Sequence, residues 1–235
     1  MNELILIPCS RSKNPGGKKS ISGRKITDQL NEMNSQELYR LCQQVAISFN
    51  IDLKNGKNPD SELLKPAFKR YSGNLYKQIP HSAWIELDKR DDIDLVIVSA
   101  LYGLIYWDEP IINYNVAMSN TIKPRRKLYN WWKQNRLENI LATFLKNKKY
   151  HIVRSFLSGD YKKAIPQIES KIDCHWLHYE YPSLGFGSNY YRGKDVANVL
   201  NDIKTNCPEC SSRHTRRISR NEYICESCNS IYGAP

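Results

Sequence analysis

Short apolar runs separated by polar loops organise most of this chain. The clearest runs are residues 4–7 and 95–98, which consist only of Leu, Ile and Val, and a third run occupies residues 152–157. Apolar runs of this length are typical of strands buried on both faces of a sheet. Each run ends in a loop of small and polar residues, so the pattern predicts a sheet that presents reactive groups along one edge.

Apolar residues at helical spacing lie between and after these runs. They predict helices over residues 35–49, 123–149, 161–169 and 194–203. Ser35 is the expected N-cap of the first helix, and the second is expected to break near Asn135. Alternation over residues 174–181 predicts a last strand, and residues 182–193 are expected to form an aromatic, Gly-rich loop. Together these elements predict an α/β fold with a central mixed sheet flanked by helices.

Two strand ends form the expected site. Residues 9–13 (Cys-Ser-Arg-Ser-Lys) follow the first run, and residues 99–104 (Ser-Ala-Leu-Tyr-Gly-Leu) follow the second, where Gly103 can supply a positive φ. In open α/β sheets, ligands bind where loops leave the carboxyl ends of neighbouring strands. We therefore expect both turns to face one cavity, large enough for a nucleobase.

Four residues near the strand ends are candidates for catalysis. Lys13 offers an amine whose pKa the surrounding positive charge would lower, and such an amine can attack a sugar carbon and form a Schiff base; a phosphate contact is the alternative role. Cys9 is a competing nucleophile if a cation or a helix N-terminus stabilises its thiolate. Asp108 and Asp160 are the candidate carboxylates. Burial beyond the strand end would raise the pKa of Asp108 and of its neighbour Glu109, although a solvated turn before Pro110 is the simpler interpretation.

The same loops carry the groups expected to hold a base. A flipped base needs aromatic faces for stacking and polar groups for hydrogen bonds. The candidates are Ser10, Arg11, Tyr76, Ser99, Tyr102, Gly103 and Tyr114.

Positive charge is concentrated in two segments of the chain. The net charge is +11, and residues 11–25 hold six basic residues and no acidic one, while residues 123–149 hold nine against one. Such clusters favour a polyanion, because each phosphate that is neutralised releases condensed counterions. We expect nucleic acid as the partner, with DNA favoured over RNA. The backbone contacts are expected from Lys18, Lys19, Arg24, Lys25, Arg125, Arg126, Arg216 and Arg217.

The apolar runs are too short for a membrane protein. None approaches the roughly 18 residues that span a bilayer, and the first residues show no signal-peptide pattern. We therefore expect a cytoplasmic protein with no membrane partner.

Four of the seven cysteines form a spaced set, and the other three are isolated. Cys207 and Cys210 form one Cys-x-x-Cys pair, and Cys225 and Cys228 form a second after a gap of fourteen residues. Two such pairs complete a tetrahedral thiolate site with no open position, which is typical of structural zinc; iron is the lesser alternative. We expect residues 204–235 to be a zinc ribbon with a basic β-hairpin, following an α/β domain over residues 1–203.

Several spaced motifs precede this ribbon. They are Lys13 in its turn and residues 70–76 (Arg-Tyr-Ser-Gly-Asn-Leu-Tyr), 98–104 (Val-Ser-Ala-Leu-Tyr-Gly-Leu), 108–118, 128–132 (Leu-Tyr-Asn-Trp-Trp) and 157–161 (Leu-Ser-Gly-Asp-Tyr). In this order they resemble the YaaA peroxide-stress family. The first motif, Pro8-Cys9-Ser10 followed by Lys13, is similar to that of archaeosine synthase domains, which act on a modified guanine in tRNA. The resemblances imply an α/β fold that binds nucleic acid and, in some members, works on a base.

Three functions remain open at this point. The first is a DNA-binding enzyme that excises modified or damaged bases in a stress response or in phage defence, as a DNA glycosylase does. The second is a non-catalytic protein that binds the phosphate backbone of DNA. The third is an enzyme that modifies 7-deazaguanine-type bases in tRNA or DNA.

Overall fold

The computed structural model describes residues 2–53, 63–122, 125–181, 185–201, 206–219 and 222–233. Its main sheet has five strands in the order β4-β3-β1-β8-β9. Their bounds are β1 Glu3–Pro8, β3 Ile93–Ser99, β4 Gly103–Tyr106, β8 Ile152–Ser155 and β9 His175–His178. β1, β3, β8 and β9 run parallel, and β4 is antiparallel to β3, which confirms the expected mixed sheet.

β1 is the middle strand of the sheet, and every residue of that strand is buried. β3 and β8 pair with β1 on either side, with Ile97 opposite Ile7 and Arg154 opposite Ile5. The apolar runs read from the sequence are therefore interior strands, as predicted. Parallel pairing brings the ends of β1, β3 and β8 to the same edge of the sheet, where the polar loops begin.

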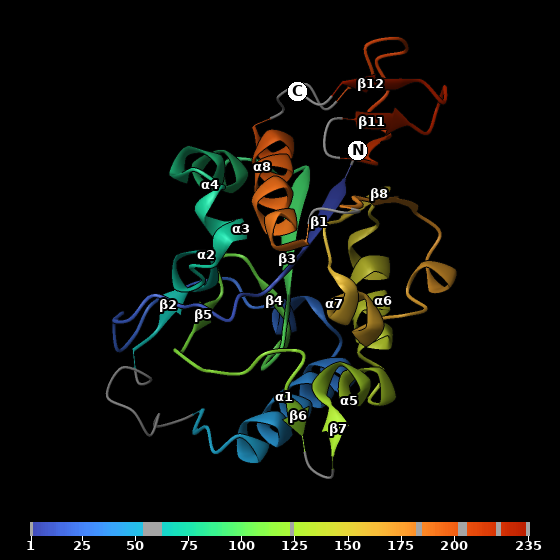
Figure 1. Cartoon of the computed structure of the whole chain (residues 1–235). Helices are drawn as coiled ribbons and strands as arrows, with labels where there is room; N and C mark the ends of the chain where they lie inside the picture. The colour runs from blue at the N-terminus through green and yellow to red at the C-terminus, as the bar shows by residue number, and fades with distance from the viewer. Residues whose placement is uncertain are drawn as a thin grey trace.

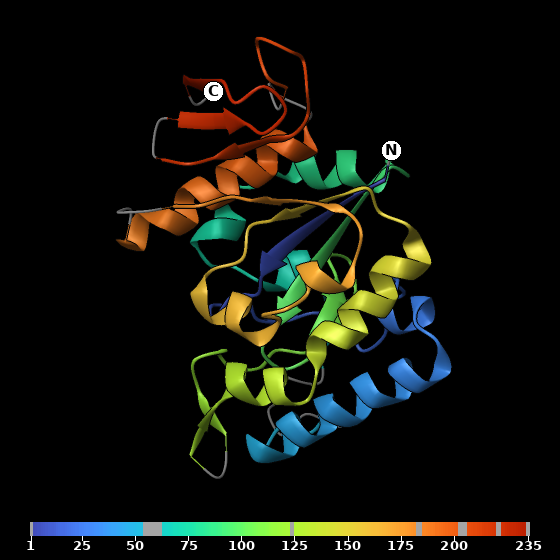
Figure 2. The same ribbon diagram turned by 90° about the vertical axis from the view of Figure 1, so that its right-hand side faces the viewer.

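Helices surround this sheet. The main helices are α1 Glu32–Ser48, α2 Ala67–Arg70, α3 Asn74–Lys77, α4 His81–Asp88, α5 Leu128–Gln134, α6 Leu137–Lys148, α7 Gly159–Ala164 and α8 Ser188–Leu200. Short 3₁₀ turns are η1 Ile26–Gln29, η2 Glu169–Lys171 and η3 Gly185–Gly187, and short strand pairs join β2 Lys65–Pro66 to β5 Pro110–Ile111 and β6 Thr121–Ile122 to β7 Arg126–Lys127. In Figures 1 and 2, α3, α4 and α8 gather on one side of β1 and β3, and α6 and α7 lie on the other.

Several boundaries differ from the sequence prediction. α1 begins at Glu32 because Asn31, rather than Ser35, caps it by accepting from the Asn34 N–H. α8 begins at Ser188, inside the segment expected to be a loop. The break in the basic helix is confirmed, because Arg136 between α5 and α6 has a φ of 57°. Residues 123 and 124 of that predicted helix lie outside the described part of the chain.

The C-terminal ribbon is a three-stranded antiparallel sheet of β10 Thr215–Arg217, β11 Glu222–Cys225 and β12 Ile231–Gly233. The expected hairpin is therefore present between the two cysteine pairs. The ribbon lies at the end of the main sheet where β1 begins (Figure 1). The predicted boundary between residues 203 and 204 falls within 202–205, which are outside the described residues.

Candidate functional site

The turn after β1 is held against the end of β3. The Cys9 N–H donates to the Val98 carbonyl at 3.0 Å, and the Ala100 N–H donates to Cys9 Sγ at 3.4 Å. The Tyr161 hydroxyl lies 3.2 Å from the same sulfur and donates to the Cys9 carbonyl. The thiol is thus nearly buried, in contact with an N–H donor and a hydroxyl.

Lys13 folds back over this turn. Its Nζ donates to the carbonyls of Ser10 at 2.9 Å and Arg11 at 3.3 Å and lies 3.8 Å from the centre of the Tyr114 ring. Among the described residues no carboxylate lies within 4.0 Å of this nitrogen, and burial lowers the pKa of Lys13 to about 8 despite the opposing effect of Cys9. Lys13 therefore carries an amine that can lose its proton near neutral pH.

Buried hydroxyl groups continue from Lys13 into the core. The Tyr114 hydroxyl lies 2.7 Å from that of Tyr71 and 3.0 Å from that of Ser99, whose oxygen accepts from the Tyr102 N–H. Burial raises the pKa of both Tyr71 and Tyr114, so these hydroxyls stay protonated at neutral pH. Tyr76 is also buried and donates to the Pro8 carbonyl. These tyrosines form the wall behind the turn and present little ring surface to solvent.

A cavity of about 320 Å³ opens beside the turn. We call it the strand-end cavity. It is lined by residues 8–12 and 73–76 together with Ser158, Tyr161 and Asn189. The lining includes the predicted Cys9, Ser10, Arg11 and Tyr76, so the structure brings these four together around one space. The predicted Lys13, Ser99, Tyr102, Gly103 and Tyr114 are not on this lining.

The turn after β3 borders a different space. Tyr102 lines a cavity of about 400 Å³ between α1, β4 and the loops that carry residues 21–27 and 109–112, here called the edge cavity. Gly103 has the expected positive φ of 70°, and an added Cβ would lie 3.0 Å from side chains of three residues. The two turns are adjacent, but the first lines the strand-end cavity and the second lines the edge cavity. The expectation that both turns face one cavity is therefore wrong for these two cavities. The reason is that the Tyr71, Tyr114 and Ser99 cluster fills the space behind the first turn.

Neither predicted aspartate lies on the strand-end cavity lining. Asp108 pairs with Arg24 at 3.2 Å, and Arg24 also reaches Asp94. Asp160, in the first turn of α7, is 3.7 Å from Lys163. The desolvated carboxylate of the pair after β4 is Glu109, whose pKa burial raises to about 7.

The predicted phosphate contacts divide into two groups. Exposed side chains are Lys18, Lys19, Lys25, Arg125 and Arg126. Arg217 is only 3% exposed and pairs with Asp195, which corrects its assignment to the nucleic-acid surface. Arg216 forms an ion pair with Glu226, and Arg24 forms ion pairs with Asp108 and Asp94. Both arginines therefore already have acidic partners within the chain.

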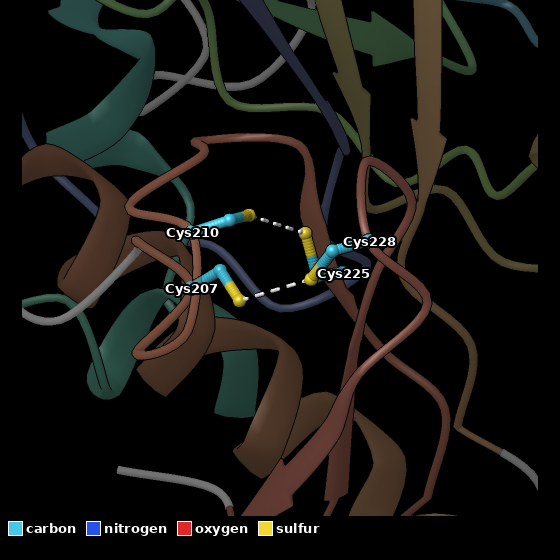
Figure 3. Close-up of side chains that lie close together, drawn as sticks. All are labelled: Cys207, Cys210, Cys225 and Cys228. Atoms are coloured by element: carbon cyan, nitrogen blue, oxygen red, sulfur yellow. Dashed lines mark hydrogen bonds between the residues drawn. The ribbon is translucent and has the colours of Figure 1, made fainter.

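The four ribbon cysteines converge as their spacing predicts (Figure 3). Their ligand atoms all lie within 4.8 Å of one another, and Sγ atoms of Cys207 and Cys228, and of Cys210 and Cys225, are 3.6 Å apart. Four sulfurs held 2.3 Å from one zinc ion in a tetrahedron would be about 3.8 Å apart. The cluster is therefore suited to a metal ion.

The comparison with known families decides what kind of protein this is. Residues 4–209 match the family described as peroxide stress protein YaaA. The chain belongs to the YaaA family. No curated protein matches it. The match confirms the YaaA resemblance read from the spaced motifs, while the similarity of the first motif to archaeosine synthase domains stays a prediction. The matched region ends at residue 209, so most of the ribbon lies beyond it.

Two features of this YaaA-family chain escaped the sequence analysis. Tyr161 lies on the quoted motif of residues 157–161, but only its contact with Cys9 identifies it as part of the site. Arg70 is fully buried and donates to the carbonyls of Asn14 at 2.5 Å and Leu63 at 2.6 Å, so it fixes the loop that follows Lys13. A buried arginine that binds backbone oxygens leaves no signal in a single sequence.

The described part of the chain contains no helix that is both long enough and apolar enough to cross a membrane.

Proposed function

We propose that this YaaA-family protein binds DNA and excises a modified or damaged nucleobase at the strand-end cavity, with Lys13 as the nucleophile. The observation that carries the proposal is the state of Lys13. A half-buried lysine that has no carboxylate of the described residues within 4.0 Å and has a pKa of about 8 is a suitable amine nucleophile at physiological pH.

The strand-end cavity suits the substrate of such a reaction. Its volume of about 320 Å³ lies within the usual range for small-molecule pockets and exceeds that of one base. Its lining mixes hydroxyl, amide and guanidinium groups from Ser10, Arg11, Asn74, Ser158 and Asn189, which can hydrogen-bond to a base edge or to sugar and phosphate oxygens.

Lys13 follows the lining residues 8–12 but is not itself on the lining, so the proposed chemistry requires Nζ to leave the carbonyls of Ser10 and Arg11 and to turn into the cavity. The neutral amine then attacks C1′ of the nucleoside, the glycosidic bond breaks, and its electron pair departs with the base, which takes up a proton. The amine loses a proton and the sugar ring opens to give an iminium ion. Hydrolysis of that ion releases Lys13 and leaves an abasic site.

Exposed cations support the binding part of the proposal. Lys18 and Lys19 follow the Lys13 turn in the chain, and Arg125 and Arg126 lie at the β6–β7 hairpin. Exposed lysines and arginines without internal partners are the groups that contact phosphates and release counterions.

Borohydride trapping tests the enzymatic step. The protein is incubated with duplexes that carry uncommon bases, including modified phage DNAs, and borohydride is added to reduce any iminium ion. We expect a covalent adduct with the wild-type protein and with Lys19→Ala, and none with Lys13→Ala. Cys9→Ala shows whether the thiol contributes, because slower base release with the Lys13 adduct still trapped would give the thiol a supporting role.

Two outcomes would replace the proposal. Salt-sensitive DNA binding with no released base in the whole panel would leave a non-catalytic DNA-binding protein. Release or exchange of a base only in tRNA would move the function to the base-modifying alternative.

We also propose that the ribbon cysteines bind zinc as a structural ion. Cys207, Cys210, Cys225 and Cys228 would fill its coordination sphere, so the ion would stabilise the ribbon without taking part in a reaction. Metal analysis of the purified protein, expected to give one zinc per chain, tests this assignment.

A further inference from the structure

The edge cavity is separate from the strand-end cavity and has its own character. Apolar side chains provide most of its walls, among them Ile26, Leu38, Leu104 and Ile105. Tyr39, more than half exposed, and the exposed Lys25 also line it. A cavity of about 400 Å³ with apolar walls and few polar groups has the form of a small-molecule site.

Glu109 is the acidic group of this cavity. Its Oε2 accepts from the Ile26 N–H at 3.0 Å and from the Tyr106 N–H at 3.1 Å. Its Oε1 accepts no hydrogen bond from the described chain. Arg24, which pairs with the neighbouring Asp108, also pairs with Asp94 and makes no ion pair with Glu109. One oxygen of the carboxylate thus fixes the side chain, and the other is left for a donor.

Oε1 of Glu109 is not fully enclosed by the chain, so a donor can reach it. A hydrogen bond to a charged oxygen is stronger in apolar surroundings than in water. Burial also raises the pKa of Glu109 to about 7, and Asp108 and Asp28 add to this rise. A ligand that brings an N–H group to Oε1 would make such a bond, whereas an aliphatic ligand would leave the oxygen without a donor.

We propose that the edge cavity binds a flat aromatic ligand with N–H donors on its edge, such as an arylamidine or an aminoheterocycle, and that Glu109 Oε1 accepts from it. The aromatic part would lie between the apolar walls, and the donor edge would face the carboxylate. This inference does not depend on base excision at the strand-end cavity.

Calorimetric titration of the full chain with benzamidine tests the proposal. Benzamidine has a flat ring and an amidinium edge, and benzoate has the same shape with the opposite charge. We expect benzamidine to bind the wild-type protein and benzoate to bind at least tenfold more weakly. No detectable binding of benzamidine and 2-aminobenzimidazole at millimolar concentration would overturn the proposal.

Three variants locate the binding. In Glu109→Gln the side-chain oxygen can still accept from both backbone N–H groups, while an NH₂ group replaces Oε1. We expect at least a tenfold loss of benzamidine affinity, the usual effect of losing one charge-assisted hydrogen bond. Asp28→Asn removes a nearby exposed charge outside the cavity lining and should change the affinity less than threefold.

Ile21→Trp covers the case in which Glu109→Gln alters the fold. Ile21 is a loop residue on the cavity lining, so a larger ring there should occlude the space and abolish binding while Glu109 stays intact. Equal affinity of the wild type, Glu109→Gln and Ile21→Trp would place benzamidine elsewhere and contradict the inference.

Discussion

The two ends of the central sheet bury positive charge in opposite ways. At the carboxyl ends of the strands, Lys13 has two backbone carbonyls and the Tyr114 ring as neighbours, and no carboxylate of the described residues within 4.0 Å. At the amino ends, Arg154 is fully buried and pairs with Glu3 at 2.8 Å, and it also donates to ribbon carbonyls, including that of Arg213.

The difference shows in the acid–base behaviour of the two groups. Burial lowers the pKa of Lys13 to about 8, because the opposing effect of Cys9 is smaller and Arg70 lowers the pKa further. Burial also acts to lower the pKa of Arg154, but Tyr179 and Glu3 more than compensate, so that pKa is raised. Similar desolvation therefore accompanies an amine with a lowered pKa at one end, and at the other end a permanent charge that joins the ribbon to the sheet.

Removal of the ribbon metal should have the largest effect. Metal binding supplies on the order of 10 kcal/mol to the folding of small zinc domains, so Cys225→Ser or a strong chelator should unfold residues 206–233. NMR spectra and metal content measure this. Cys174→Ser, at a half-buried cysteine outside the cluster, is the control and should keep both. An ordered ribbon without metal would show that the paired end of the sheet is held by its ion pairs alone.

The second prediction compares two neighbouring ribbon arginines. Arg217 and its partner Asp195 are both buried, so Arg217→Ala leaves an uncompensated carboxylate and should lower the free energy of unfolding by about 3–5 kcal/mol. Arg216 makes a more accessible pair with Glu226, and Arg216→Ala should cost less than about 1 kcal/mol. Denaturant unfolding measures both. Similar losses would mean that burial does not separate the two pairs.

The third prediction concerns the unpaired charge itself. The pKa of Lys13 falls from 10.5 when unfolded to about 8 when folded, so charging it opposes folding fully below pH 8 and not at all above pH 10.5. Lys13→Met keeps the length of the chain and removes the charge. The variant should be more stable than the wild type by about 1–2 kcal/mol at pH 6–7, and the gap should close as the pH rises. A variant less stable at pH 6 would mean that the carbonyl contacts of Nζ outweigh its desolvation.

The smallest effect is expected at Asp108. Its pair with Arg24 is partly exposed, and it is not part of the strand-end cavity lining. Asp108→Asn should change stability by less than about 1 kcal/mol and any base release by less than twofold. A larger loss of base release would restore Asp108 as a catalytic candidate.

Local patterns in the sequence were enough for the interior strands and the metal cluster. The runs at residues 4–7 and 95–98 have no polar interruption, and two Cys-x-x-Cys pairs have few alternative interpretations. Both features depend on short-range spacing. β4 was missed because Gly103–Tyr106 is too short to show a periodicity and pairs only through a tight return from β3.

The electrostatic partners could not be predicted in this way. Arg217 belongs to a basic segment, and only the fold brings it to Asp195 on α8. Asp108 and Glu109 are adjacent in one turn, and the direction of that turn decides that Asp108 meets Arg24 while Glu109 enters the edge cavity. Contacts between residues far apart in the chain, rather than residue type, determine which charges are structural and which remain available.

Direct titration of Lys13 by NMR tests the central claim most directly. The chemical shifts of its side-chain Cε and Nζ, assigned by comparison with Lys13→Met, report its protonation between pH 6 and pH 11. We predict a midpoint of about 8 for Lys13. A midpoint at or above 10 for Lys13 would contradict the view that an unpaired, buried amine is available at the carboxyl ends of the strands.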